Sequence, residues 1–282
     1  MPNRLARAAL DLEPYPQPPL LRMRYPVVLM HGFGAIANLL QGGVLNREAL
    51  YLRERGVWAY APHVNPYNPI AERAATWAER LEHVFEETRA EKVNLVGFSS
   101  GGLDARHLAA DPAWQARIAS IVAVSTPHLG SPLADFIEAH PRAVLGPMNA
   151  IMDWMGRAAY EHAIPDVVRS LGQLTTAYMT ETFAPAHPEP EGILCASVTG
   201  RAGRGATAPI FPPLYPLYRI VLAAGGVNDG FVPVESGRAF GEFWGCIEAD
   251  HAAQIGLRIR GGRFDARRFY LSLCGKLAER GC

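Results

Sequence analysis

The chain has 282 residues, with 27 basic and 27 acidic side chains and 49% hydrophobic residues. A chain of this length and composition can bury a large core without disulfides or metal, which excludes a disordered or fibrous protein. The zero net charge excludes a protein that binds nucleic acid or an anionic membrane mainly through charge.

No targeting or membrane segment is predicted. The N-terminus reaches Asp11 and Glu13 before a signal-peptide core could form. The longest apolar stretches fall short of the ~20 residues that a membrane helix needs. We therefore expect a cytoplasmic protein, with the mature form of a secreted protein as the alternative.

The four cysteines (Cys195, Cys246, Cys274 and Cys282) follow no metal-ligand spacing. Cys195 and Cys246 both fall in predicted strands and could lie close together. Free thiols in a packed interior are favoured over a disulfide, because cysteine is often buried unpaired.

Strands alternate with amphipathic helices along most of the chain. This alternation predicts a parallel sheet with both faces covered by helices. Asn68 is expected to cap a helix. In that helix Ile70, Trp77 and Leu81 recur at 3.6-residue spacing, so they form one apolar face that packs on the sheet. The other helices are predicted at 46–56, after Gly97 and at 266–279, and the strands at 25–30, 57–61, 93–96, 118–124, 193–198 and 243–248.

Residues 131–190 interrupt the alternation, within what we predict to be a single domain spanning residues 1–282. Their pattern is mostly helical, and we interpret them as a lid insertion over the sheet. Met148, Ile151, Met152 and Met155 form one apolar stripe. Flexible methionines suit a lid over an apolar site, but an ordinary core helix fits the same periodicity.

A Gly-x-Ser-x-Gly pattern, from Gly97 to Gly101, stands where a predicted strand ends and a helix begins. In this context the pattern is typical of a nucleophile elbow, a strained turn whose small residues let strand and helix approach. A serine hydroxyl needs a neighbouring base to become a good nucleophile. We therefore predict that Ser99 is the nucleophile.

Chain order narrows the choice of its partners, because the acid and then the histidine follow the serine in folds with this elbow. His251 is the only histidine beyond residue 187. Asp229 is the favoured acid, although its Asn-Asp-Gly context fits a plain turn equally well. Glu235 and Glu242 are alternatives more typical of solvated charges, and Asp250 is too close in the chain to reach the His251 Nδ1 atom.

Two backbone N–H groups are expected to stabilise an oxyanion. One belongs to Ser100, at the start of the helix after the nucleophile. The other belongs to Phe33, in the His31-Gly32-Phe33-Gly34 turn after the first strand. His31 itself is expected to be structural.

With these residues in place, the chain resembles bacterial true lipases of the Pseudomonas and Burkholderia type. The likeness runs in order from about residue 25 to 260, through the segments VVLMHGFGA, VNLVGFSSGGLDARHLA, STPHLGSPLADF, LTTAYM, NDGFVP and ADHAAQIG. It implies an α/β-hydrolase fold with a mostly parallel sheet and a helical lid. It also implies a carboxylic ester hydrolase, lipase or esterase, that cleaves acyl glycerols or related lipophilic esters through an acyl-enzyme. Transient contact with a lipid–water interface is a further option.

The resemblance also supports a catalytic triad of Ser99, Asp229 and His251, with Phe33 and Ser100 as the backbone oxyanion donors. Two neighbours of the nucleophile differ from the family, which usually has histidine and glutamine where Phe98 and Ser100 stand. The backbone donor survives both differences.

The family's calcium site and disulfide are both expected to be absent. Ala252 and Ala253 follow the histidine where the family usually reads Leu-Asp, and the loop PIFPPLYPLYRI offers no second carboxylate. Calcium prefers several hard oxygen ligands, so we predict an enzyme without metal or other cofactor. The family's cysteine after the catalytic aspartate is missing, with Glu235 near that place.

Other functions fit the same residues. A thioesterase, a polyester hydrolase or an acyltransferase could use the same triad. A non-catalytic binding protein of this fold is the alternative from another class, but it would not need serine, aspartate and histidine together in this order.

Overall fold

A six-stranded sheet forms the centre of the computed structural model, which describes residues 20–32, 43–140, 167–257 and 263–282. Its strand order is β2-β1-β3-β4-β5-β6, and every neighbouring pair is parallel. The strands are β1 (Val27–Met30), β2 (Ala59–Tyr60), β3 (Val93–Phe98), β4 (Ile118–Val124), β5 (Leu194–Arg201) and β6 (Glu242–Glu248).

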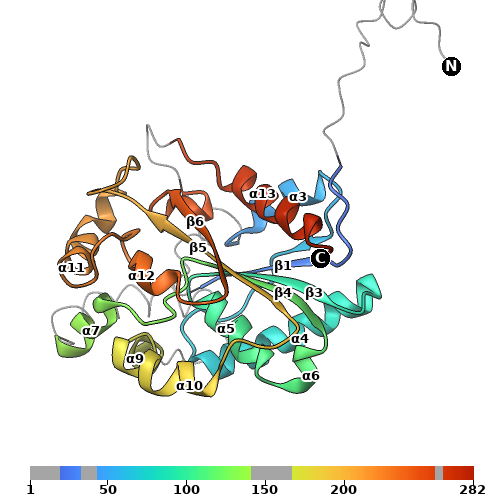
Figure 1. Ribbon diagram of the computed structural model, residues 1–282, viewed down its shortest axis with the longest axis horizontal. Coiled ribbons are helices and arrows are strands. Elements are labelled where there is room, and N and C mark those ends of the chain that lie inside the picture. The colour runs from blue at the N-terminus through green and yellow to red at the C-terminus, as the bar shows by residue number, and fades with distance from the viewer. Residues whose placement is uncertain (1–19, 33–42, 141–166, 258–262) are drawn as a thin grey trace, which may run out of the picture.

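Helices cover both faces of the sheet (Figure 1). Helices α3 (Asn46–Arg53) and α13 (Ala266–Glu279) pack on one face, and α4 (Ile70–Thr88) and α5 (Ser100–Ala109) pack on the other. The remaining helical elements are α6 (Pro112–Gln115), α7 (Pro132–Ala139), α9 (Val167–Gly172), η1 (Tyr178–Phe183), α10 (Ala184–Ala186), η2 (Pro212–Leu214), α11 (Tyr215–Gly225), α12 (Val234–Gly237) and η3 (Ala253–Ile255).

The strand β1 shows why these segments read as continuous apolar runs. Val27 and Leu29 enter the core under α3 and α13, while Val28 and Met30 enter the core under α4 and α5. Alternate residues of a strand point to opposite faces, so a sheet covered on both sides needs apolar residues at every position. The predicted α/β-hydrolase fold, with its mostly parallel sheet flanked by helices, is confirmed.

The start of α4 corrects one prediction. Pro69, not Asn68, stands at the N-cap, and no side chain of the cap residue bonds to the helix. The N–H of Ile70 instead donates to Gln173 Oε1 at 2.8 Å. A residue about a hundred positions away thus satisfies the helix terminus, which local sequence could not reveal. The second strand is also shorter than the predicted 57–61.

The described parts of the 131–190 insertion are helical. They comprise α7, α9, the π-helix η1 and α10, and together with α11 and α12 they gather on the left in Figure 1. The stripe of Met148, Ile151, Met152 and Met155 lies outside the described residues.

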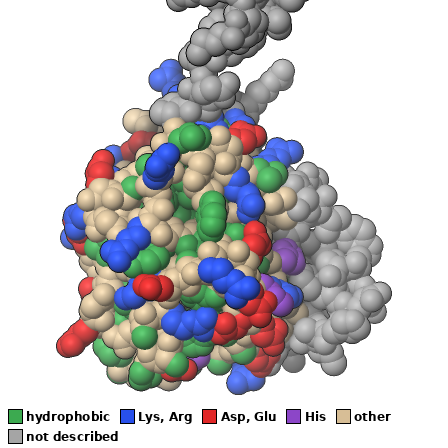
Figure 2. All heavy atoms as spheres, turned by 90° about the vertical axis from the view of Figure 1, so that its right-hand side faces the viewer, with side chains coloured by type: hydrophobic (Ala, Val, Ile, Leu, Met, Phe, Trp, Pro, Cys, Tyr) green, Lys and Arg blue, Asp and Glu red, His purple; other side chains and the backbone are tan. Residues whose placement is uncertain are grey.

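The surface mixes both charge signs, as the equal counts predict. Figure 2 shows one face on which basic and acidic side chains are interspersed. Within the described ranges, the helices include none with the length and apolar character needed to cross a bilayer.

All four cysteines are free thiols. Cys195 and Cys246 lie on neighbouring strands, but the register of β5 and β6 places Cys246 beside Thr199. The apolar face of α4 reaches full burial at Trp77 and Leu81, each 0% exposed.

We predict that Leu81→Ala lowers the free energy of unfolding by about 2–5 kcal/mol, because it removes a fully buried side chain and leaves a cavity. Leu50→Ala is the matched control, since Leu50 is 53% exposed on α3, and it should change stability by no more than about 0.5 kcal/mol. Urea denaturation measures both. Equal effects of the two substitutions would contradict this assignment of the core.

Candidate active site

Ser99 occupies a strained turn at the carboxyl end of β3. Its backbone angles are φ 55° and ψ −132°, a left-handed conformation that costs a non-glycine residue free energy. Two glycines let the turn close: a Cβ atom on Gly97 would lie 2.5 Å from the Gly102 Cα atom, and one on Gly102 would overlap Thr126. The turn therefore has the geometry expected of a nucleophile elbow.

The structure brings Ser99, His251 and Asp229 into one hydrogen-bonded chain. Ser99 Oγ lies 3.1 Å from His251 Nε2, and His251 Nδ1 lies 2.7 Å from Asp229 Oδ2. Since a carboxylate oxygen accepts, Nδ1 carries the proton and Nε2 is free to accept from the serine hydroxyl. Ser99 and His251, which are 152 positions apart in the chain, thus lie in contact. The acid and then the histidine follow the serine, in the predicted chain order.

Asp229 is fully buried and accepts four hydrogen bonds. Its Oδ1 atom accepts from the N–H groups of Phe231 and Val232, and its Oδ2 atom accepts from His251 and from Gln254 Nε2 at 2.9 Å. Burial alone raises the pKa of this carboxyl, but the His251 ring and the two N–H groups outweigh burial and hold it below its usual range. Asp229 is therefore held as a carboxylate facing the imidazole.

Two aromatic rings flank His251. The Phe98 ring centroid lies 4.6 Å from that of His251, and the Phe231 centroid lies 4.9 Å away. Phe98 stands where the resemblance to lipases predicts a histidine, so here an apolar ring packs against the imidazole.

The alternative acids lie in other interactions. Glu235 pairs with Arg238, and Glu242 pairs with Arg280 on the exposed surface. Asp250 accepts from the N–H of Ala253 at 2.7 Å and from the N–H of Phe211 at 2.5 Å.

The carboxylate of Asp250 therefore joins the His251 loop to the segment before α11 through hydrogen bonds. With Ala252 and Ala253 beside it, this segment does not fit a calcium site, whose ligands are several oxygens. In the described part of the chain, no three histidine, cysteine or acidic side chains cluster in a way that could hold a metal ion.

The turn after β1 reaches the nucleophile. A Cβ atom on Gly32 would lie 2.5 Å from the Ser99 Cβ atom and 2.9 Å from the Ser100 nitrogen. Ser100 is the first residue of α5, where backbone N–H groups lack partners within the helix. Phe33, the other predicted oxyanion donor, lies outside the described residues.

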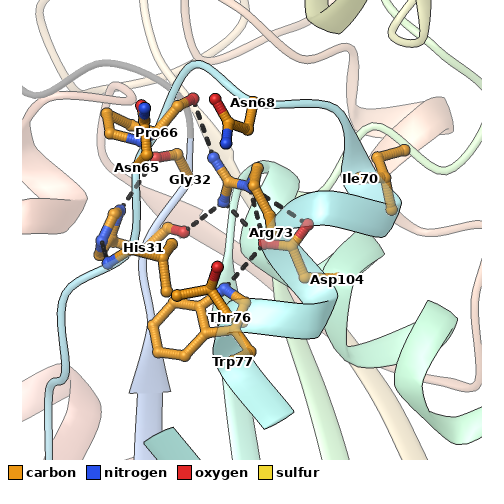
Figure 3. A network of polar contacts seen from close by, with 12 residues as sticks. His31, Gly32, Asn65, Pro66, Asn68, Ile70, Arg73, Thr76, Trp77 and Asp104 are labelled. Carbon is orange, nitrogen blue, oxygen red and sulfur yellow. Dashed lines mark hydrogen bonds and ion pairs between the residues drawn. The ribbon is translucent and has the colours of Figure 1, made fainter. Parts of the chain in front are cut away.

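A buried ion pair fixes this corner of the molecule (Figure 3). The Arg73 guanidinium donates to Asp104 Oδ2 at 2.7 Å from Nη2 and at 3.0 Å from Nε, and Trp77 Nε1 donates to the same oxygen. Arg73 also donates to the carbonyl oxygens of His31 and Pro66. One arginine on α4 thus joins α5, the helix that follows the nucleophile, to the turn after β1.

The sequence contains one signal for this pair. Arg73 falls on the apolar face of α4, between Ile70 and Trp77 at helical spacing. A charge on a buried face requires a buried partner. Gln254, which donates to Asp229, is marked in the sequence only by its place three residues after His251.

His31 is buried and neutral. Its Nε2 atom accepts from the N–H of Val64 at 3.3 Å. Burial first, and then the nearby Arg73 and His63, lower its pKa to about 3. This supports the structural role expected for His31.

We predict that Arg73→Met lowers the free energy of unfolding by about 3–5 kcal/mol, because it leaves the Asp104 charge buried without its partner. Arg117→Met is the control, because Arg117 forms a half-exposed pair with Glu82. It should lower stability by about 1 kcal/mol or less. Thermal and urea denaturation measure both, and a small effect at Arg73 would contradict its structural role.

We also predict a loss of stability in acid that depends on His31. Between about pH 6.5 and about pH 3 the unfolded chain binds a proton at His31 that the folded chain excludes, so stability falls as the pH falls. His31 contributes at most about 1.4 kcal/mol per pH unit to the slope of the free energy of unfolding against pH. His31→Gln keeps an acceptor and should flatten the curve, whereas His83→Gln, at an exposed position, should not. Parallel curves for His31→Gln and the unchanged protein would contradict the prediction.

Comparisons with known proteins agree with this geometry. A family model described as the alpha/beta hydrolase fold matches residues 25–190, more than half of the chain. A triacylglycerol lipase from Pseudomonas fragi is 31% identical over 112 residues, which make up 40% of this chain and 38% of that protein. One from Burkholderia plantarii is 32% identical over 126 residues, 41% of this chain and 33% of that protein. These matches span well under half the length of each relative.

Among solved structures, the Staphylococcus hyicus lipase superposes with a TM-score of 0.68 over 94% of this chain and 98% of that chain. The two are 17% identical, so this likeness shows the shared fold. The family match and the parallel sheet lead to one assignment: the chain belongs to the α/β-hydrolase fold family, in which it is similar to bacterial triacylglycerol lipases.

Proposed function

We propose that the protein is a serine-dependent carboxylic ester hydrolase, with Ser99, His251 and Asp229 as its catalytic triad. The observation that carries the proposal is the hydrogen-bonded chain from Ser99 Oγ through both nitrogens of His251 to Asp229 Oδ2. A serine becomes nucleophilic when an adjacent base can take its proton, and a third group holds that base in the required tautomer.

The first half of the reaction forms an acyl-enzyme. His251 Nε2 takes the Ser99 proton as Oγ attacks the ester carbonyl carbon. The resulting oxyanion is stabilised by backbone N–H groups, which we assign to Ser100 and Phe33. The carbon–oxygen bond to the alcohol then breaks, and His251 gives its proton to the departing alcohol oxygen.

The second half releases the acid. His251 takes a proton from water, the hydroxide oxygen attacks the acyl carbon, and the bond to Ser99 Oγ breaks as His251 returns the proton to the serine. Asp229 stays ionised throughout and stabilises the transient imidazolium. This role agrees with the four hydrogen bonds that hold it as a carboxylate.

Lipophilic esters are the substrate class that we assign. The curated relatives are triacylglycerol lipases. Exposed apolar side chains of Leu129, Val168 and Val227 belong to segments that follow the carboxyl ends of β4 and β5, the edge of the sheet at which Ser99 lies. A net charge of zero also suits a substrate recognised by apolar contact. The insertion at 131–190 is assigned as the lid over this site.

Ser99→Ala should lower the hydrolysis of p-nitrophenyl esters by about a thousandfold or more, because it removes the nucleophile. Ser100→Ala is the matched control, since it keeps the backbone N–H and removes only a buried hydroxyl that has no partner within the described residues. It should retain activity within about tenfold. Rates on esters from acetate to palmitate measure the effect, and chains longer than acetate should be preferred.

Equal activity of Ser99→Ala and the unchanged protein would contradict the assigned nucleophile. A preference for acetate would contradict the lipophilic substrate class while leaving the nucleophile in place.

Gln254 is assigned as a positioning residue for the triad. Gln254→Ala should lower kcat by about 10–100-fold with little change in KM, because it removes a hydrogen bond to a buried charged group. Gln115→Ala, which removes an exposed hydrogen bond from Gln115 Nε2 to the Glu191 carbonyl, is the control. A rise in KM at constant kcat would indicate that Gln254 acts on substrate binding instead.

A further inference from the structure

A pocket of about 530 Å³ lies beside α11, apart from the triad. Its size falls in the range of about 300–1,000 Å³ that is usual for small-molecule sites. Both basic and aromatic side chains line it, and no acidic side chain of the described residues does. The lining residues are Gly203, Arg204, Ile210, Tyr215, Tyr218, Arg219 and Leu222.

Helix α11 separates this pocket from the active-site side. Val221, with Leu217 and Ile220, packs into the apolar cluster that contains Leu133 of α7 and also Phe231, whose ring contacts His251. Tyr215, Tyr218, Arg219 and Leu222 follow helical spacing on another face and line the pocket. The pocket is therefore a different site from the one that contains Ser99.

One part of the pocket lining is formed by close packing of the turn at Gly203 and Arg204 against Tyr218. Gly203 has φ +72°, and a Cβ atom there would lie 2.7 Å from the Tyr218 ring and hydroxyl. The hydroxyl of Tyr218 accepts from the N–H of Arg204 at 2.7 Å. Tyr218 is 4% exposed, so its ring is fixed against the backbone of the turn.

The turn that carries Arg204 is held from its other side by Glu248. This carboxylate accepts from the Thr207 N–H at 2.5 Å and from the Thr207 hydroxyl at 2.8 Å, and it pairs with Arg201. These bonds, from the Thr207 N–H first, lower the pKa of Glu248 to about 2. The acidic charge near the turn is thus already used by Thr207 and Arg201, outside the pocket.

Arg204 and Arg219 contribute two positive charges to the pocket. Both are exposed, and neither guanidinium has an ion pair or side-chain hydrogen bond with any residue that the structure describes. In contrast, Arg238 and Arg280, the residues that directly follow α12 and α13, pair with Glu235 and Glu242. A guanidinium presents a planar fork of donors that matches a carboxylate.

We propose that the α11 pocket binds an amphipathic carboxylate, a molecule with one carboxylate group on an alkyl or aryl body. Arg204 and Arg219 would hold the carboxylate, and the apolar body would lie against Tyr215, Leu222 and Ile210. The uncompensated charge favours an anion, while the aromatic and aliphatic lining favours a ligand with more apolar surface than inorganic phosphate.

The segment that forms the pocket also contacts the neighbours of the triad. The N–H of Ala202 donates to the Asn228 carbonyl at 3.0 Å, beside Asp229, and the N–H of Phe211 donates to Asp250, beside His251. The fatty acid that ester hydrolysis would release belongs to the proposed ligand class. That the bound carboxylate is the reaction product rests on the proposed function, whereas the binding of a carboxylate at this pocket does not.

Isothermal titration of octanoate below its micelle concentration tests the proposal. A Ser99→Ala background keeps the result independent of catalysis. We expect saturable binding that weakens at least tenfold in the Arg204→Gln/Arg219→Gln variant and also weakens in Tyr215→Ser. Arg22→Gln, at an exposed arginine near the N-terminal side of the fold, should not change it. Octanol and inorganic phosphate, which each lack half of the ligand, should bind at least tenfold more weakly.

Binding of octanoate that is unchanged in the double variant would overturn the proposal, because the ligand would then sit in another apolar site. Arginine-dependent binding only to vesicles of anionic phospholipid would also overturn it, in favour of a lipid surface. Melting curves check that each variant is folded, as expected for exposed positions. Ester hydrolysis by the protein with Ser99 intact is measured separately, so a failure of the proposed function would leave the octanoate result standing.

Discussion

The close approach of three backbone segments at the carboxyl edge of the sheet is the constraint on which the candidate site depends. The turn after β1, the end of β3 and the first turn of α5 meet with no side chain between them. At Gly32, Gly97 and Gly102 a single added Cβ atom would overlap a neighbour. Because these segments cannot separate, Ser99 is held in a left-handed conformation that costs about 1–3 kcal/mol, and its side chain projects toward His251.

Two buried carboxylates, Asp104 and Asp229, then serve different purposes at this site. Asp104 is paired with Arg73, whose rigid guanidinium also fixes the His31 carbonyl. Asp229 has no arginine partner among the described residues and faces an imidazole instead, with two backbone N–H groups and Gln254 completing its hydrogen bonds. A full ion pair locks a position, whereas a carboxylate next to imidazole leaves a proton that can move. The ion pair that fixes the turn and the hydrogen-bonded chain that includes Ser99 thus use different carboxylates.

Most of the fold and of the triad could be predicted from the sequence, because each depended on periodicity or chain order. Continuous apolar runs predicted strands that the sheet buries on both faces, and the elbow pattern together with the order of acid and histidine selected Asp229 and His251. The structure brings these two and Ser99 together, and their catalytic roles stay a proposal.

The failures share a physical cause, which is dependence on distant partners. Gln173 satisfies the start of α4 in place of Asn68, and neither Gln254 nor Arg73 is identified by local pattern alone. Hydrogen bonds between residues far apart in the chain leave little trace in sequence spacing. The structure also forms the helix α11 (Tyr215–Gly225) where part of a loop, PIFPPLYPLYRI, is predicted from the sequence.

The central claim is that Ser99 is an activated nucleophile, and covalent labelling tests it most directly. A fluorophosphonate loses fluoride when a serine oxygen attacks its phosphorus, which leaves a phosphonyl group on that oxygen. Peptide mass spectrometry should find this group on Ser99 alone, with labelling slowed strongly in His251→Ala. A folded protein that takes no label, or that is labelled at another residue to the same extent with Ser99→Ala, would contradict the account.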